Sequence, residues 1–154
     1  MNIGLALAGG GLQGIAHIGA IKALEDLNVK IDYISGTSSG SIFAAMYAIG
    51  FTTDEMKEFA REYYKTLIKI EKRPIISAVG NYLIHKNVKI GGLISGEKIE
   101  NLVRQFADKK KIKNISDVQM PLAIPTVDTI STKECIFMSK ELKTKREDIE
   151  YIYD

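Results

Sequence analysis

Residues 3–14, IGLALAGGGLQG, decide the fold class of this chain. The apolar run over residues 3–8 is short and ends at three successive glycines, which is typical of a buried strand rather than a helix. From Gly14 to Leu27, isoleucine and leucine recur at three-residue steps, so an amphipathic helix follows the glycines and ends near Asn28. The chain therefore opens with a strand, a glycine loop and a helix.

Residues 33–41, YISGTSSGS, repeat this order. A short strand over about residues 33–35 leads into a glycine-flanked turn, and helical character resumes until Gly50. Parallel neighbouring strands need a helical crossover between them, so two successive units of this kind predict a mainly parallel sheet with covering helices. The chain is therefore expected to be an α/β protein.

The rest of the chain is expected to add helices and strands to this start. Thr52 or Thr53 with Glu55 begins a helix that extends to Ile70, and Ser95 to Ala107 forms a second, amphipathic helix. Pro121 to Val127 and Glu134 to Met138 are expected to be two strands joined by a polar hairpin turn. The charged stretch from Lys140 to Asp154 is expected to be a frayed helix. The mixed apolar and glycine residues over 75–95 predict no particular helix or strand.

Length and composition exclude several classes of protein. The 154 residues suit one domain, and a net charge of +2 gives no support to nucleic-acid binding. The single cysteine, Cys135, excludes an internal disulfide and favours a reducing compartment, where it is expected to be a small buried residue. No secretory signal is visible, and no apolar run approaches the ~20 residues of a membrane span. We therefore expect a cytoplasmic protein whose membrane contact, if any, is peripheral, with no metal or organic cofactor.

The turn after the second strand has the Gly-x-Ser-x-Gly spacing of a nucleophile elbow, with Ser38 between Gly36 and Gly40. A serine at a sharp strand-to-helix turn is raised above the sheet, where a substrate carbonyl reaches its hydroxyl. The turn brings backbone segments close together, so the residues two before and two after must be small. The alternative is an ordinary turn in which Ser38 or Ser39 caps the helix.

The glycine loop supplies the second half of a catalytic pattern. Gly9, Gly10 and Gly11 allow backbone N–H groups to turn toward an anionic oxygen without side-chain obstruction. In acyl transfer that oxygen is the oxyanion of the tetrahedral intermediate, and losing one donor typically costs roughly 10²–10³ in rate. We therefore predict an oxyanion hole at this loop.

The same loop also fits the Gly-x-Gly-x-x-Gly fingerprint of dinucleotide-binding domains. That function requires an acidic residue at the end of the second strand, ~20 positions onward. Asp32 has nearly this spacing but stands at the start of the strand, and the serine turn occupies its end. An acyl-transfer site needs both glycine motifs on neighbouring strands, so the pattern favours a hydrolase. A dinucleotide-binding domain and a catalytically silent scaffold remain the alternatives.

Together the two motifs resemble those of patatin-like phospholipases. The resemblance is specific over residues 1–50 and looser over residues 90–139. It rests on Gly9–Gly14, on Ile15–Gly19 with Leu24 and Glu25, on Gly36–Ser41, and on Ile124–Asp128. It implies a three-layer α/β/α sandwich and a Ser–Asp dyad that hydrolyses lipid acyl esters, with Ser38 as nucleophile and Gly9, Gly10 and Gly11 around the oxyanion.

The sequence departs from the family pattern at two points. Gln13 stands where family members often carry Arg or Lys. The family's catalytic aspartate lies in an Asp-Gly-Gly or Asp-Gly-Ala motif, and the chain has no Asp-Gly pair. We therefore expect residues 1–154 to be one incomplete domain that lacks the last strands and the aspartate, and is nearly inactive alone. A truncated sheet edge is expected to promote self-association.

Three other residues carry side chains that could act as a catalytic base. His17 lies on the first helix and is expected to pack there, His85 is expected at the surface, and Asp128 ends a strand at a position that is non-catalytic in the family. None of the three is expected to touch the chemistry.

A basic stripe is the candidate surface for a lipid membrane. It consists of Arg61, Lys65, Lys69, Lys72 and Arg73. These residues recur at mostly four-residue steps, which fits either an amphipathic helix on an anionic surface or an ordinary solvated helix face.

Overall fold

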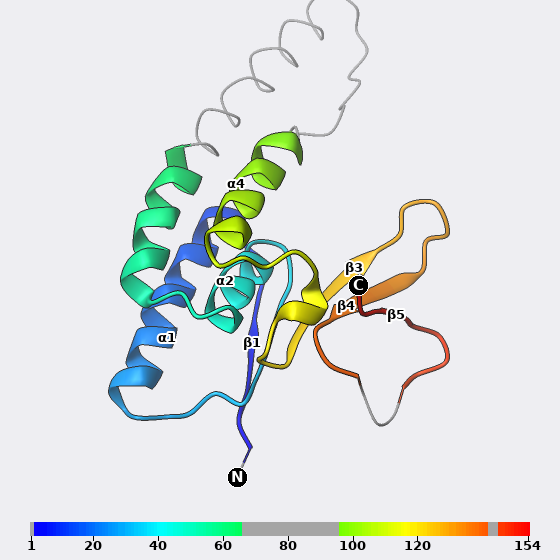
Figure 1. The fold of residues 1–154 in the computed structure, drawn as a ribbon, viewed down its shortest axis with the longest axis horizontal. Coiled ribbons are helices and arrows are strands. Elements are labelled where there is room, and N and C mark those ends of the chain that lie inside the picture. The colour runs from blue at the N-terminus through cyan, green and yellow to red at the C-terminus, as the bar shows by residue number, and fades with distance from the viewer. Residues whose placement is uncertain (1, 66–95, 142–144) are drawn as a thin grey trace, which may run out of the picture.

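The computed structural model describes residues 2–65, 96–141 and 145–154 (Figure 1). Its elements in chain order are β1 (Gly4–Leu7), η1 (Gly11–Ile15), α1 (Ala16–Asp26), β2 (Tyr33–Gly36), α2 (Ser39–Ala48), a helix over residues 53–65, α4 (Gly96–Lys109), η2 (Ile115–Asp117), β3 (Leu122–Val127), β4 (Glu134–Met138) and β5 (Glu150–Ile152). The expected start of the chain, two strand–loop–helix units, is confirmed.

The strands form one five-stranded sheet in the order β1-β2-β3-β4-β5. β1, β2 and β3 are parallel neighbours, β4 returns antiparallel beside β3, and β5 runs parallel to β4. The hairpin expected between β3 and β4 is therefore confirmed. The α/β fold with a mainly parallel sheet is confirmed as well.

The described helices cover one face of the sheet. β2 lies beside β1, and β3 lies beside β2 on the side away from β1. Because crossovers between parallel strands are right-handed, the helices that follow β1 and β2 both pack on the same face of the sheet. Leu7, Ile34 and Leu122 from three adjacent strands are buried in one apolar cluster with these helices. Burial of that cluster is the main force that holds the sheet to the helices.

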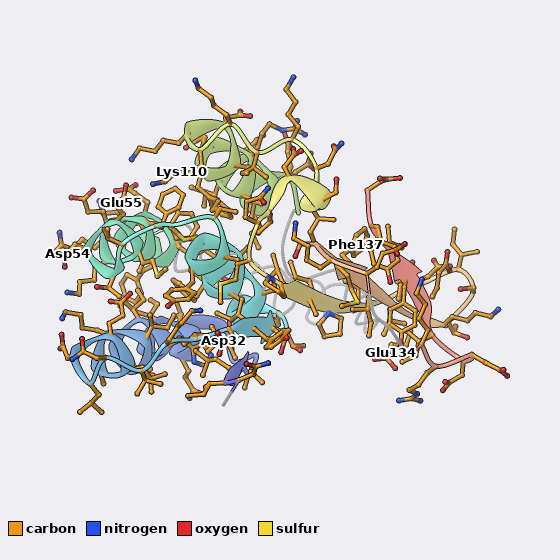
Figure 2. All side chains as sticks on the ribbon, turned by 60° about the horizontal axis from the view of Figure 1, so that its bottom comes forward. Asp32, Asp54, Glu55, Lys110, Glu134 and Phe137 are labelled. Atoms are coloured by element: carbon orange, nitrogen blue, oxygen red, sulfur yellow. The ribbon has the colours of Figure 1, made fainter. Side chains whose placement is uncertain are left out.

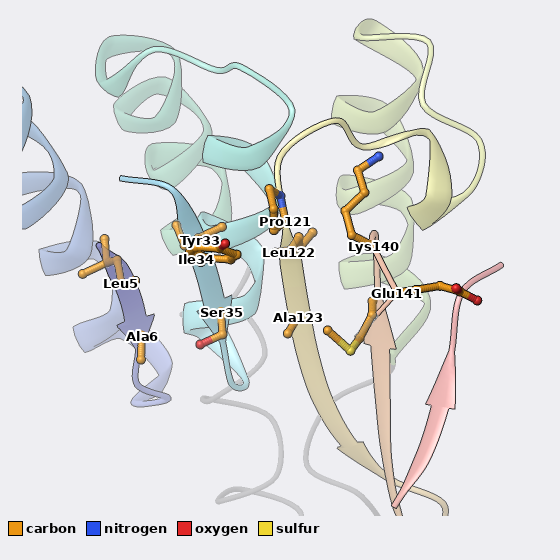
Figure 3. Close-up of a pocket in the computed structure, with 12 residues that line it drawn as sticks. Leu5, Ala6, Tyr33, Ile34, Ser35, Pro121, Leu122, Ala123, Lys140 and Glu141 are labelled. Atoms are coloured by element: carbon orange, nitrogen blue, oxygen red, sulfur yellow. The ribbon is translucent and has the colours of Figure 1, made fainter. Parts of the chain in front are cut away.

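The other face of the sheet forms an apolar groove of about 410 Å³ (Figure 3). The residues Ala6, Ser35, Ala123 and Met138 are successive cross-strand partners and lie in this groove. The groove lies along the strands themselves, whereas Ser38 follows the end of β2. It is therefore separate from the predicted active site.

Local sequence signals explain where the helices begin and end. Asn28 takes the left-handed conformation (φ 55°) just after Leu27, the C-cap of α1, as expected of a residue that closes a helix. The Glu55 carboxylate accepts the Thr52 backbone N–H at 2.9 Å, and the Thr52 hydroxyl accepts the Glu55 N–H at 3.2 Å. This capping box fixes the start of the helix over residues 53–65, and the expected end at Ile70 lies outside the described residues.

Lys110, the residue after α4, contacts the start of the helix over residues 53–65. Lys110 donates to the Gly50 carbonyl at 3.1 Å, lies 3.8 Å from Glu55, and places its ammonium 4.6 Å from the centre of the Phe51 ring (Figure 2). Beneath it, Phe106 meets Phe51 and Phe59 edge-on, with ring centres 5.9 and 5.6 Å apart. Aromatic packing thus closes the helical layer over residues that are far apart in sequence.

The expected helix over Lys140 to Asp154 is wrong. Residues 150–152 form the strand β5, whose Tyr151 and Ile152 are the cross-strand partners of Ile136 and Phe137. An apolar pair that binds an open sheet edge outweighs the weak helical preference of the charged residues before it. Cys135, on the strand between β3 and β5, is buried as expected, and burial raises the pKa of its thiol.

Candidate active site

Ser38 has the strained backbone of a nucleophile elbow. It is the residue before α2, with φ 52° and ψ −127°, and a positive φ is unfavourable for any side chain with a Cβ. Its hydroxyl makes no capping hydrogen bond to the helix, and the residue is exposed. The backbone carbonyl of Ser38 instead accepts the Ser41 hydroxyl at 2.6 Å. The alternative in which Ser38 is only a helix cap therefore does not fit this geometry.

The flanking glycines fill the roles expected from the spacing. A Cβ on Gly36 would lie 2.3 Å from the Gly40 carbonyl oxygen, and a Cβ on Gly40 would lie 2.4 Å from the Leu7 oxygen and 2.6 Å from the Ala8 oxygen. These are backbone atoms and cannot rotate away. The first turn of α2 therefore packs directly on the end of β1, where the glycine loop begins.

This packing brings the glycine loop against Ser38. A Cβ on Gly9 would lie 2.9 Å from Ser38 Cβ and 3.7 Å from Ser38 Oγ. Gly11 has φ 56°, and the Gly10 carbonyl accepts the Gln13 N–H at 3.0 Å, which turns the chain into η1. The structure thus places the predicted nucleophile beside the first residue of the predicted oxyanion loop.

The loop also has unused hydrogen-bond donors. Within the described part of the chain, the N–H groups of Gly9, Gly10 and Gly11 donate to no protein acceptor. The N–H of Ser39, the first residue of α2, is equally without an acceptor among these residues. The sequence pattern alone did not identify the Ser39 N–H as a donor. Backbone donors that have no acceptor in the described residues, next to a serine hydroxyl, are what an anionic oxygen requires.

His17 has a more definite contact than the packing expected for it. Its Nε2 lies 2.8 Å from the carbonyl oxygen of Ala8, the residue before the glycine loop. α1 therefore holds the end of β1 through His17, and Gly40 of α2 packs so close to the same carbonyl oxygen that a Cβ there would lie 2.6 Å from it. The side chain does not reach Ser38 through any hydrogen bond, so it is placed to orient the loop.

Replacing His17 with alanine is expected to lower kcat roughly 10- to 100-fold, because a loop that shifts by even 1 Å loses its alignment with the reacting oxygen. KM is expected to stay unchanged. His17→Gln keeps an N–H that can donate to the Ala8 carbonyl, so this variant is expected to recover much of kcat. Steady-state kinetics on the three proteins check the prediction, and equal kcat in wild type and His17→Ala would contradict it.

No catalytic base contacts Ser38 among the described residues. None of their carboxylates or imidazoles accepts a hydrogen bond from its hydroxyl. Asp128 is used in the β3–β4 turn, where its carboxylate accepts the N–H groups of Ile130 and Ser131 at 3.0 and 3.1 Å. A bond from the Ser131 hydroxyl, followed by these amides, holds the pKa of Asp128 below its ordinary value, whereas a general base needs a pKa near the working pH. His85 lies outside the described residues.

The position of Asp32 separates the chain from a dinucleotide-binding domain. Its carboxylate accepts the Ile3 N–H at 2.9 Å and lies 3.3 Å from the Lys30 ammonium, at the end of the sheet where β1 and β2 begin. The Ile3 hydrogen bond first, and Lys30 second, lower the pKa of Asp32. The glycine loop lies at the opposite end of the same strands. Asp32 therefore cannot serve as the ribose-binding acid that a dinucleotide fingerprint requires.

Two buried serines near these elements give a stability prediction. Ser39 Oγ has no hydrogen-bond partner among the described residues, whereas Ser139 Oγ donates to the Met120 carbonyl at 2.7 Å and accepts the Leu122 N–H at 2.8 Å. Ser39→Ala is expected to leave the free energy of unfolding unchanged or raise it by up to about 1 kcal/mol, and Ser139→Ala to lower it by about 1–3 kcal/mol. Urea denaturation of both variants checks this, and equal losses would contradict it.

The fold and the elbow define an α/β protein with an exposed serine between a parallel strand and a helix. The family model described as patatin-like phospholipase matches residues 5–152, so the chain belongs to this family. It is 43% identical over 128 residues to Patatin-like phospholipase domain-containing protein 6 of Homo sapiens, an alignment that covers 82% of this chain and 8% of that protein. It is 60% identical over 47 residues to Lysophospholipase NTE1 of Coccidioides immitis, covering 30% of this chain and 3% of that one.

Among solved structures, the chain resembles full-length ExoU from the type III secretion system of Pseudomonas aeruginosa. The TM-score is 0.49 at 17% identity, over 89% of this chain and 34% of that one. The chain thus spans a small part of the relatives that it matches. In residues 2–65, 96–141 and 145–154, no three His, Cys, Asp or Glu side chains form a group that could hold a metal ion. No helix in these ranges is long and apolar enough to cross a membrane.

Proposed function

We propose that the protein is a serine lipid acyl hydrolase of the patatin type, with Ser38 as nucleophile. The observation that carries this proposal is the position of Gly9 against Ser38 Cβ and Oγ, beside amides that donate to no acceptor in the described residues. The family match supports lipid esters as the substrate class, and one relative is named a lysophospholipase. We add the Ser39 N–H to the proposed oxyanion donors Gly9, Gly10 and Gly11.

The proposed reaction has two steps. Ser38 Oγ attacks the acyl carbonyl carbon while its proton passes to a base, and the carbonyl oxygen becomes an oxyanion that accepts hydrogen bonds from the loop amides. The C–O bond to the alcohol part of the lipid then breaks, and that oxygen takes the proton from the base. Water attacks the acyl–Ser38 ester in the second step and releases the fatty acid and the free serine.

The base is the part of the proposal that rests on the family resemblance alone. In a Ser–Asp dyad, an aspartate accepts the proton of the serine hydroxyl. No described carboxylate occupies that place, so we propose that an aspartate from outside residues 1–154 serves as base. Without it, the oxyanion donors and substrate binding would leave a residual acceleration of roughly 10³–10⁴ over water.

Covalent labelling tests the proposed nucleophile. A fluorophosphonate reacts with an activated serine and mimics the tetrahedral intermediate, so it is expected to add one phosphonyl group to the full gene product. Peptide mass spectrometry should place that group on Ser38. Labelling of another serine, or none, would refute the proposal, and a saturable titration with a nicotinamide dinucleotide would support the dinucleotide-binding alternative. Peripheral membrane contact and self-association stay predictions.

A further inference from the structure

A groove between α1 and the helix over residues 53–65 lies apart from the serine. It has a volume of about 750 Å³, within the roughly 300–1,000 Å³ that is usual for ligand pockets. Its α1 side consists of Ile15, Ala16, Ile18 and Gly19. Ile15 is the last residue of η1, which begins at Gly11 of the glycine loop. The groove therefore starts about one helical turn from the candidate active site.

The floor of the groove is apolar and leaves space for the hydrocarbon part of a ligand. Ile15, Ile18 and Ala60 offer only apolar side chains. Gly19 has no side chain, and a Cβ built on it would meet no heavy atom within 4 Å. A glycine inside a helix costs about 0.5–1 kcal/mol relative to alanine, and here it leaves the groove open along α1.

The opposite rim is basic. Lys57, Arg61 and Lys65 follow each other at four-residue steps on one face of their helix, and none of the described residues that line the groove is acidic. Lys57 and Lys65 each pair at 2.8 Å with an acid of their own helix, Asp54 and Glu62. All four side chains are more than half exposed, so such pairs are weak and can exchange for another anion.

Arg61 differs from the two lysines in its charge partners. Among the described residues no acidic side chain forms an ion pair with it, although it lines the groove. A guanidinium presents a planar pair of N–H donors that matches a carboxylate bidentately. An apolar floor, with a guanidinium on its rim that pairs with no acid in the described part of the chain, is complementary to a hydrocarbon tail that ends in a single carboxylate.

We propose that this groove binds a long-chain fatty acid, with the tail against Ile15, Ile18 and Ala60 and the carboxylate at Arg61. That this ligand is the same fatty acid that the reaction releases rests on the proposed function. The binding of a fatty acid in the groove does not. Because Ile15 lies one turn of η1 from Gly11, a product retained in the groove is expected to crowd the glycine loop and slow turnover. The groove then makes the rate of ester hydrolysis depend on how much fatty acid has accumulated.

Oleate below its micelle concentration is the probe, titrated calorimetrically into the full gene product carrying Ser38→Ala. This background keeps the binding result independent of whether Ser38 is the nucleophile. Gly19→Leu fills the groove and improves helix propensity, so the variant is expected to fold and to bind oleate at least tenfold more weakly. Ala20→Leu adds the same side chain to α1 at an exposed position outside the groove, and is expected to bind like the parent protein.

The head group is tested by a second matched pair. Arg61→Gln is expected to weaken oleate binding roughly tenfold, the loss of a charge-assisted hydrogen bond, and to leave the binding of uncharged oleyl alcohol unchanged. Arg104→Gln removes an exposed arginine from α4, where it pairs with Glu100, and is expected to have no effect. Unchanged oleate binding in Gly19→Leu, or equal losses in both arginine variants, would overturn the proposal.

Discussion

Substitution of Ser38 by alanine is expected to lower lipid-ester hydrolysis by the full gene product by a factor of about 10⁴–10⁶. The reason is that the acyl-enzyme cannot form without the hydroxyl, while the free amides of the glycine loop and substrate binding remain. KM is expected to change little, because the alanine removes one oxygen and leaves the elbow backbone in place. Hydrolysis of a fluorogenic acyl ester, with liberated fatty acid measured in parallel, checks the prediction.

Ser131→Ala is the matched control, because Ser131 is an exposed serine in the β3–β4 turn. It is expected to retain wild-type turnover and wild-type fluorophosphonate labelling. A Ser38→Ala protein that keeps more than a few per cent of wild-type activity would show that another group is the nucleophile. Urea denaturation of both variants verifies that the comparison is made between folded proteins.

Substitution of Gly36 by alanine is expected to destabilise the protein by about 3 kcal/mol or more. The added methyl group would lie 2.3 Å from the Gly40 carbonyl oxygen and 2.7 Å from Ser41 Cα, both of them backbone atoms of the first turn of α2. Relief requires α2 to move away from the end of β2, which carries Ser38 with it. The variant is therefore expected to lose activity even at temperatures where it remains folded.

Gly19→Ala makes the same chemical change where space is available. No atom beyond the local helix backbone lies within 4 Å of the added Cβ, and the residue is the fourth of α1, so the free energy of unfolding is expected to rise by about 0.5–1 kcal/mol. Chemical denaturation of both glycine variants measures the contrast. Comparable stabilities of Gly36→Ala and wild type would mean that the elbow is not packed as tightly as the structure shows.

Much of the fold could be predicted from local sequence because each local signal agrees with the tertiary structure. The run before Gly9 is too short and too apolar for a surface helix, and the glycines that follow fix its end. Thr52 or Thr53 with Glu55 predicts a helix start, and the structure has both hydrogen bonds of the capping box at Thr52. The Ser38 turn could be found because only small residues fit beside it.

Other features depend on pairs of residues that are distant in sequence, and no local pattern reports them. β5 exists because Tyr151 and Ile152 meet the open edge of β4, and the charged residues before them suggested a helix instead. The hydrogen bond from His17 to the Ala8 carbonyl joins a helix to the loop before it, and a histidine on a helix face gives no indication of its partner. The groove beside α1 required two helices to be placed side by side.

The contact of Gly40 with the carbonyl oxygens of Leu7 and Ala8 has a consequence for how the protein responds to temperature. Ser38 follows β2 and the Gly9–Gly11 amides follow β1, yet this contact fixes their relative positions when the helical layer forms. Little reorganisation is left for the chemical step. Warming is therefore expected to increase the turnover rate steadily up to the melting transition of the domain, with no earlier loss from a loosening loop.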